Sequence, residues 1–152
     1  FRLLDERLPF LISVSFSHFK SPHGWRLDLI LRARRLECGF YGALTKELSD
    51  NGYMLAIDDY GVDASTVQRV KCVRPNIIKI DRSLLLRYES GDFACLMEAL
   101  SLAKDIRSKT VIEGIETEHQ LNLMKKLGFD MYQGYLLAMP QTLEAYQEVK
   151  TA

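Results

Sequence analysis

The sequence predicts an α/β fold built on parallel strands, and three observations lead to that prediction. Short apolar runs of strand character alternate with longer segments whose apolar residues recur at helical spacing. No low-complexity linker interrupts the 152 residues, a length that suits one domain with a substantial core. Alternation of strands and helices favours a parallel sheet with right-handed crossovers. We therefore expect a single domain over residues 1–152, with helices outside the sheet.

Each expected element follows from residue spacing and from end signals. The run 25–36 is expected to be a helix because Trp25, Leu29 and Leu36 are spaced along one buried face. Asn51-Gly52 is a typical helix stop. Taken in order, the expected elements are a strand over 10–15, helices over 25–36 and 41–50, a strand over 54–57, a helix over 65–73, a strand over 77–80, a helix over 93–106, a strand over 110–113, a helix over 117–128, a strand over 131–133 and a helix over 142–149.

Two helices carry a capping box at their start, a pair of side chains that bond reciprocally to the first-turn backbone. Ser65 and Gln68 have this spacing, and so do Thr117 and Gln120, while Gly128 ends the second of these helices. The count of five strands falls short of a closed eight-stranded barrel, which needs roughly 250 residues. The chain is therefore expected to be an open sheet, a partial barrel, or a barrel with pieces absent.

The composition narrows the classes of partner and location. Lys plus Arg and Asp plus Glu both number 20, so there is no basic excess and no nucleic-acid polymer is expected as a partner. No apolar run is long enough to span a bilayer, and no signal peptide opens the chain. Cys38, Cys72 and Cys95 are odd in number and widely spaced, which argues against a disulfide framework and for a reducing compartment. A cytoplasmic domain, or the cytoplasmic part of a membrane-bound protein, is expected.

Polar residues follow four of the expected strands. In a parallel α/β protein the residues just past the carboxyl ends of the strands converge on one rim. Three carboxylates, a lysine and an amide on such a rim suit divalent cations and a phosphate ester. The residues in question are Asp58, Asp59, Lys79, Glu113 and Gln133.

Four phrases in this order carry a resemblance to a known family. They are Asp58-Asp59-Tyr60-Gly61, then Lys79-Ile80-Asp81-Arg82-Ser83, then Glu113-Gly114-Ile115-Glu116-Thr117 with Gln120-Leu121, and finally Gln133-Gly134-Tyr135 with Pro140. Residues 52–141 resemble the C-terminal half of the EAL domain, the bacterial module that hydrolyses cyclic-di-GMP. The resemblance implies an EAL-type TIM-like barrel, incomplete in this chain, with parallel strands and outer helices.

The resemblance also implies a role for each residue of the rim. Asp58 would bridge two Mg2+ or Mn2+ ions, and Asp59 would bind the second ion. Glu113 would bind the second ion or orient the ligands of its coordination shell. Lys79 would position the attacking water and help to deprotonate it. Gln133 would hold a water or ligand of the shell. Paired ions neutralise an anionic phosphodiester and stabilise both the attacking and the leaving oxygen. Glu116 is expected beside this shell, where it braces the turn.

The chain departs from the family pattern on the other side of the rim. The Glu-Ala-Leu strand that names the family is absent, and Ser15 stands where the family has an asparagine ligand. An Ile-Thr-Glu acid is expected between Leu36 and Tyr41, but only Leu36-Glu37-Cys38-Gly39 stands there, so a strand is expected to be missing. The loop over 61–66 also lacks a glycine and the tyrosine of the family loop. Catalysis is therefore expected to be impaired in this chain.

Three functions of different classes remain open from the sequence. The first is an EAL domain that binds or senses cyclic-di-GMP without cutting it. The second is an active metal-dependent cyclic-di-GMP phosphodiesterase in its full-length form. The third is a protein-interaction module on an inactive EAL scaffold. The resemblance further implies a homodimer and fused sensory or diguanylate cyclase (GGDEF) domains as partners.

Overall fold

The computed structural model describes residues 2–3, 11–15, 28–32, 38–51, 54–62 and 67–139. Through these residues runs a sheet of seven strands that are neighbours in chain order. The strands are β1 (Arg2–Leu3), β2 (Leu11–Ser15), β3 (Asp28–Arg32), β4 (Met54–Tyr60), β5 (Ile77–Ile80), β6 (Lys109–Ile112) and β7 (Met131–Tyr132). Strand β2 is antiparallel to both β1 and β3, whereas β3 to β7 all pair in parallel. The parallel, chain-ordered strands before the four phrases confirm the predicted fold class.

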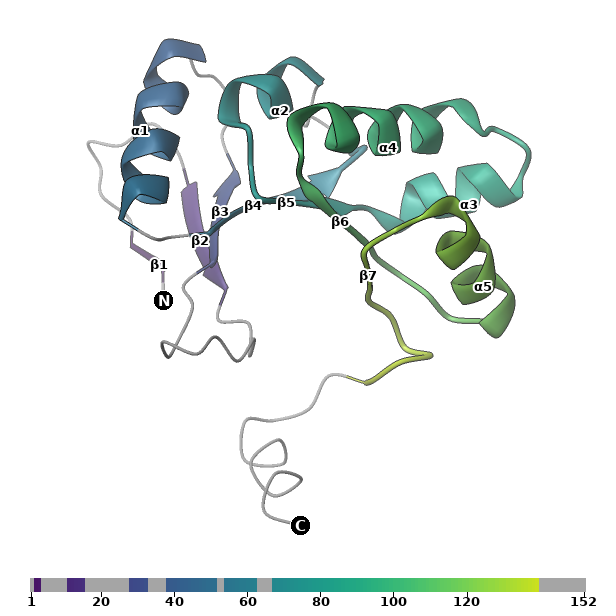
Figure 1. Cartoon of the computed structure of the whole chain (residues 1–152). Helices are drawn as coiled ribbons and strands as arrows, with labels where there is room; N and C mark the ends of the chain where they lie inside the picture. The colour runs from purple at the N-terminus through teal and green to yellow at the C-terminus, as the bar shows by residue number, and fades with distance from the viewer. Residues whose placement is uncertain are drawn as a thin grey trace.

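Among the described residues, five helices cover one face of this sheet (Figure 1). They are α1 (Cys38–Asp50), α2 (Val67–Val73), α3 (Arg82–Glu89), α4 (Ala94–Ile106) and α5 (Glu118–Leu127). Figure 1 shows the helices on the outer side of a curved sheet, as in a barrel wall that has not closed. Within the described part of the chain, no helix is both long and apolar enough to cross a membrane. The expected helix over 142–149, and Ser65 of the first capping box, lie outside the described residues.

The expected helix over 25–36 is wrong where the structure describes it, because residues 28–32 form strand β3. The run Leu29-Ile30-Leu31 is apolar throughout, and so short a run fits a buried strand as well as a buried helix. Pairing decides between them, since β3 lies between β2 and β4 and bonds to both. Among the described residues, β3 is the strand that precedes β4 in the sheet, and it lies upstream of residues 36–41, where the third-strand motif of the family was expected.

Helix α3 was not expected from the sequence, although its start carries a clear signal. Asp81 has extended backbone angles and its carboxylate accepts a hydrogen bond from the Ser83 amide at 2.8 Å, which is the geometry of a helix N-cap. Asp81 therefore has a structural role as the N-cap of α3. A second difference concerns the cysteines: Cys72 forms a disulfide, whereas Cys95 is a free thiol. The sequence did not predict the disulfide of Cys72.

The hydrophobic core lies between the sheet and helices α2 to α5. Along β5 the burial alternates, so that Ile78 and Ile80 are fully buried while Lys79 is only partly buried. Strand β6 repeats the pattern with Thr110 and Ile112 buried. Because successive side chains of a strand point to opposite faces, the buried set faces the helices and the alternate set faces the other side. Fully buried partners from the helices include Val70, Leu85, Leu96, Ala99 and Met124.

Helix α5 begins with the predicted capping box. The Thr117 hydroxyl accepts a hydrogen bond from the Gln120 amide at 3.2 Å, and the Gln120 side chain accepts one from the Thr117 amide at 3.2 Å. The buried Gln120 side chain also accepts from the Glu116 amide at 2.9 Å and donates to Glu89 at 3.0 Å. One glutamine thus fixes the start of α5, the preceding turn and the end of α3 relative to one another.

We expect Thr117→Ala to lower the free energy of unfolding by about 1 kcal/mol, because the substitution removes the acceptor for a first-turn amide. Urea unfolding followed by circular dichroism measures the change. His119→Ala is the control, since His119 is an exposed residue in the first turn of the same helix. An equal loss in both variants would contradict a specific capping role.

Candidate functional site

Three carboxylates and one lysine meet at the carboxyl ends of β4, β5 and β6. One oxygen from each of Asp58, Asp59 and Glu113 lies within 4.8 Å of the other two. The Lys79 ammonium is 2.8 Å from Asp58 Oδ1 and 2.5 Å from Glu113 Oε1. The structure therefore brings together the four charged residues that the sequence predicted at one rim.

The pleat of the sheet explains how Lys79 and Glu113 come to face each other. Lys79 lies between two buried isoleucines of β5, and Val111 is its partner on β6. Glu113 follows β6 two residues after Val111, so it shares the face that Lys79 uses. Both side chains therefore leave the sheet on the side away from the helices.

Asp58 and Asp59 share the site because of a bulge in β4. Ile57 pairs with Ile78 and Tyr60 with Ile80, so β4 advances three residues while β5 advances two. Ile57 and Tyr60 both belong to the core, and Asp59 between them has a left-handed backbone with φ 53°. In a regular strand the two neighbouring aspartates would point to opposite faces. The extra residue instead places both carboxylates at the rim.

This bulge was not predicted from the sequence, although a signal for it exists. Two adjacent acids between Ile57 and Tyr60 cannot satisfy a strict two-residue alternation without burying one of them. Aspartate tolerates the left-handed region better than most residues, so the strain of order 1–3 kcal/mol for a non-glycine residue is at the low end here.

Burial and the ion pairs of Lys79 shift the pKa values of Lys79 and Glu113 in opposite directions. Burial alone lowers the pKa of the Lys79 ammonium, but its bonds to Asp58 and Glu113 outweigh burial, and the net pKa is raised. Burial raises the pKa of the Glu113 carboxyl, and repulsion from Asp58 and Asp59 adds to the rise, although Lys79 works against it. The pKa of the Glu113 carboxyl is therefore raised, and burial rather than crowding is the largest cause.

Two glycines hold the turns that carry the third and fourth phrases. Gly114 has φ 76°, and the stem of Arg82 lies where its side chain would be. A side chain on Gly134 would overlap the backbone of Ile115. That close approach lets the Ile115 amide donate to the Gln133 carbonyl at 3.0 Å, and the Gln133 amide to the Ile112 carbonyl at 2.9 Å. Gln133 is thus fixed at the same rim by its backbone, with an exposed side chain.

Glu116 and Ser15 stand apart from the acid cluster. The Glu116 carboxylate pairs with Arg82 at 2.6 Å, so it braces the turn as expected. Ser15 pairs with Asp28, and Asp28 with Met54, at the amino end of β4. Because β2 runs antiparallel, Ser15 lies at the end of the sheet away from Asp58, roughly 13 Å along the strand. Strand β3 carries its acid, Asp28, at that same far end. The structure does not bring Ser15 to the site.

The donor set of the rim fits a hard divalent cation. Carboxylate oxygens are the ligands that Mg2+ and Mn2+ prefer. Three such oxygens, one each from Asp58, Asp59 and Glu113, lie close enough together to coordinate a single ion. A cation there would compete with the Lys79 ammonium for Asp58 and Glu113. The fold and rim together define a barrel-type α/β domain with an acidic site at the carboxyl ends of its strands.

Comparison with known proteins places this chain in a family. The EAL domain family model matches residues 15–140. The chain belongs to the EAL domain family.

Three relatives illustrate the match. The bifunctional diguanylate cyclase/cyclic di-GMP phosphodiesterase MucR of Pseudomonas aeruginosa is 33% identical over 103 residues, which cover 66% of this chain and 15% of MucR. The probable cyclic di-GMP phosphodiesterase PdeD of Escherichia coli is 30% identical, over 68% of this chain and 20% of PdeD. The solved PaMucR phosphodiesterase in complex with c-di-GMP matches with a TM-score of 0.67 and 27% identity, over 78% of this chain and 49% of that one.

A further solved EAL-domain protein shares the fold. YkuI of Bacillus subtilis, solved with c-di-GMP and calcium, matches with a TM-score of 0.59 and 24% identity, over 82% of this chain and 32% of its own. The chain thus spans about half the length of the PaMucR structure and a smaller part of the curated relatives.

We expect Lys79→Met to lower the free energy of unfolding by about 1–3 kcal/mol near pH 7 in chelating buffer, since it leaves two half-buried carboxylates without their cation. Glu113 has a folded pKa above its ordinary 4.5, so its contribution to stability falls as the pH rises above 4.5. Removal of Lys79 raises that pKa further. The loss should therefore shrink when unfolding is measured at about pH 4, where Glu113 is protonated.

Lys46→Met is the matched control, because Lys46 pairs with Asp50 at 2.6 Å on an exposed helix surface. It should leave the unfolding midpoint unchanged at either pH. A loss from Lys79→Met that is the same at both pH values would argue against the charge explanation.

Proposed function

We propose that this chain is a cyclic-di-GMP recognition domain of the EAL family that hydrolyses the nucleotide poorly or not at all. The observation that carries the proposal is the one-sided charge of the rim. Strands β4, β5 and β6 supply Asp58, Asp59, Lys79 and Glu113, whereas neither β2 nor β3 brings a described ligand to this end of the sheet. We propose that all of residues 1–152 form one such EAL unit.

The proposed roles follow from the geometry of the cluster. Asp58, Asp59 and Glu113 would hold one Mg2+ or Mn2+ ion, which when bound would supply positive charge for the phosphodiester. Lys79 Nζ holds Asp58 and Glu113 in place and offers a hydrogen bond to an attacking water or to the phosphate. Gln133 is exposed at the same rim, where its side chain could hold a water or another ligand of the ion's coordination shell. A second ion would need ligands from the side of the rim that carries none among the described residues.

A second candidate, the active phosphodiesterase, has support from the named activities of the relatives. PdeD and MucR are both named as cyclic di-GMP phosphodiesterases. MucR is also named as a diguanylate cyclase, which supports the expectation of fused domains in a longer protein. A homodimer and a cytoplasmic location stay predictions. Hydrolysis and metal stoichiometry separate the two candidates.

With excess Mg2+ or Mn2+, we expect this chain to form the linear dinucleotide from cyclic-di-GMP on the order of 10²-fold or more slowly than a MucR phosphodiesterase domain measured beside it. The reason is that a two-ion site without the ligands for one of its ions can no longer stabilise the attacking and the leaving oxygen together. Nucleotide binding, followed by calorimetry, should persist. Turnover near that of MucR that vanishes in Asp58→Asn would instead establish the active enzyme.

Titration with Mn2+ should reveal one bound ion per chain, not two, because the described ligands form a single cluster. Lys79→Met should tighten this binding, since the ammonium occupies the same carboxylates. Asp59→Asn should weaken it, while Glu116→Gln, outside the cluster, should leave it unchanged. Two ions of similar affinity per chain would contradict the one-sided site.

A further inference from the structure

A pocket lies at the opposite end of the sheet from the acid cluster. It has a volume of about 490 Å3 and opens between the C-terminal ends of α4 and α5, at the start of β6. Lys109 and Thr110 line it where β6 begins, whereas Glu113 follows the end of that strand. Pockets of this size suit small organic ligands. Nothing in the proposed EAL function uses this pocket.

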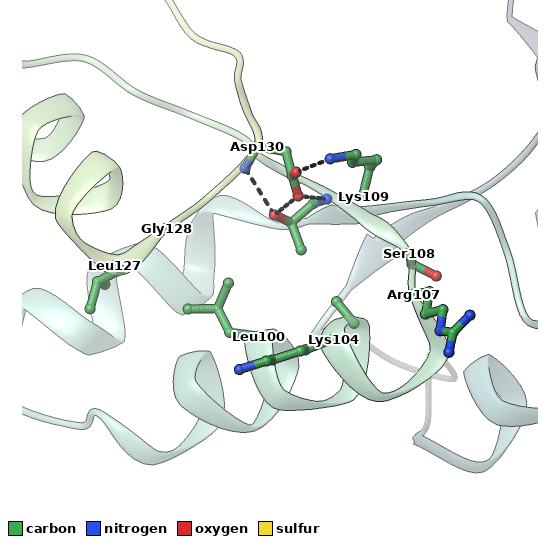
Figure 2. Close-up of a pocket in the computed structure, with 10 residues that line it drawn as sticks. Leu100, Lys104, Arg107, Ser108, Lys109, Leu127, Gly128 and Asp130 are labelled. Atoms are coloured by element: carbon green, nitrogen blue, oxygen red, sulfur yellow. Dashed lines mark hydrogen bonds and ion pairs between the residues drawn. The ribbon is translucent and has the colours of Figure 1, made fainter.

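The charge of the pocket is positive. Three cations line it, of which Lys109 is paired with Asp130 at 2.6 Å. Lys104 and Arg107 are exposed, and neither makes an ion pair with another described residue. Figure 2 shows Lys104 extending beside Leu100, and Arg107 at the other end of the pocket beside Ser108. Two uncompensated positive charges therefore flank the opening.

The neutral polar groups of the lining are already satisfied. The Ser108 hydroxyl donates to the Pro75 carbonyl at 2.5 Å. The Thr110 hydroxyl donates to Asp130 at 3.0 Å and accepts from the Asp130 amide at 3.1 Å. What remains for a ligand is the apolar surface of Leu100, Ala103 and Leu127, together with the two cations. Recognition here would depend on apolar contact and charge.

Arg107 occupies a backbone position that favours glycine. It ends α4 with φ 61°, in the left-handed region, whereas Gly128 ends α5 nearby with φ 87°. Cations near helix C-termini also interact favourably with the helix dipole, which accounts for some stability but predicts no ligand. The combination of a pocket, an apolar floor and unpaired cations goes beyond that role.

We propose that this pocket binds a small organic anion, with an apolar ring against Leu100 and Leu127, a phosphate or carboxylate on Lys104, and Arg107 attracting the anion from the other end of the pocket (Figure 2). The contact is solvent-exposed at its charged end, so the affinity falls as salt rises. The site is independent of the acid cluster on the opposite rim.

The test uses the 152-residue chain labelled with 15N, and 1-naphthyl phosphate and 1-naphthoate as probes. We expect at least one probe to produce saturable shifts of the amides over 104–110 and 127–130, and comparison of the two distinguishes phosphate from carboxylate. 1-Naphthol and inorganic phosphate, which each carry half of the proposed ligand, should bind more weakly. Equal binding of either half-ligand, or no shift with either probe, would overturn the proposal.

Lys104→Gln should weaken binding of the tighter-binding probe about three- to fivefold, as expected for the loss of one solvent-exposed charge. Arg107→Gly should weaken it as well, without a lower melting temperature, because glycine suits the left-handed position. Lys125→Gln, the same charge change on α5 outside the pocket lining, should leave binding within twofold. An equal effect of Lys125→Gln would reduce the site to diffuse surface charge and refute it. Binding of cyclic-di-GMP should be unaffected by Lys104→Gln, which keeps this test separate from that of the proposed function.

Discussion

The two ion pairs of Lys79 are the constraint on which the carboxyl rim depends. Asp58 and Glu113 come from strands on either side of β5, and their side chains are only 15% and 16% exposed. Two mostly buried carboxylates so close together repel each other and lose hydration, and a cation shared between them offsets that cost. The ammonium supplies that charge, and a divalent ion would supply more of it. The same lysine therefore stabilises the rim without metal and would compete with a bound cation for Asp58 and Glu113.

The two ends of the sheet present opposite charges for reasons of topology. In parallel α/β units every helix ends near the start of the next strand, so basic residues that suit helix C-termini gather at the amino end. Lys71, Lys104 and Lys125 each lie in the last turn of such a helix. The acids gather at the other end, where the bulged β4 and the residue after β6 meet. The opposite charges at the two ends of the sheet thus follow from the order in which the strands and helices are connected.

Much of the fold and of the acid cluster could be predicted from the sequence, because the informative residues directly follow regular helices and strands. The acids Asp58, Asp59 and Glu113 come directly after apolar strand runs, and Thr117 with Gln120 marks a helix start. The failures have physical causes. Leu29-Ile30-Leu31 is apolar on every residue, so only pairing with β2 and β4 could reveal a strand. The direction of β2, which carries Ser15 to the far end, is a tertiary property that local spacing cannot encode. The Asp59 bulge likewise depends on register with β5.

The bulge in β4 makes this segment tolerant of substitution and intolerant of changes in length. Replacing Asp59 alters one carboxylate of the rim and leaves Ile57 and Tyr60 seated in the core. Deleting one residue between them would restore strict alternation with Ile57 and Tyr60 still in the core, but only one of the two carboxylates would remain at the rim. An insertion would shift Gly61 away from its place against Leu84, where a side chain cannot fit. Single substitutions at the rim can therefore change its chemistry, while the spacing of Asp58-Asp59-Tyr60-Gly61 stays fixed by the core beneath it.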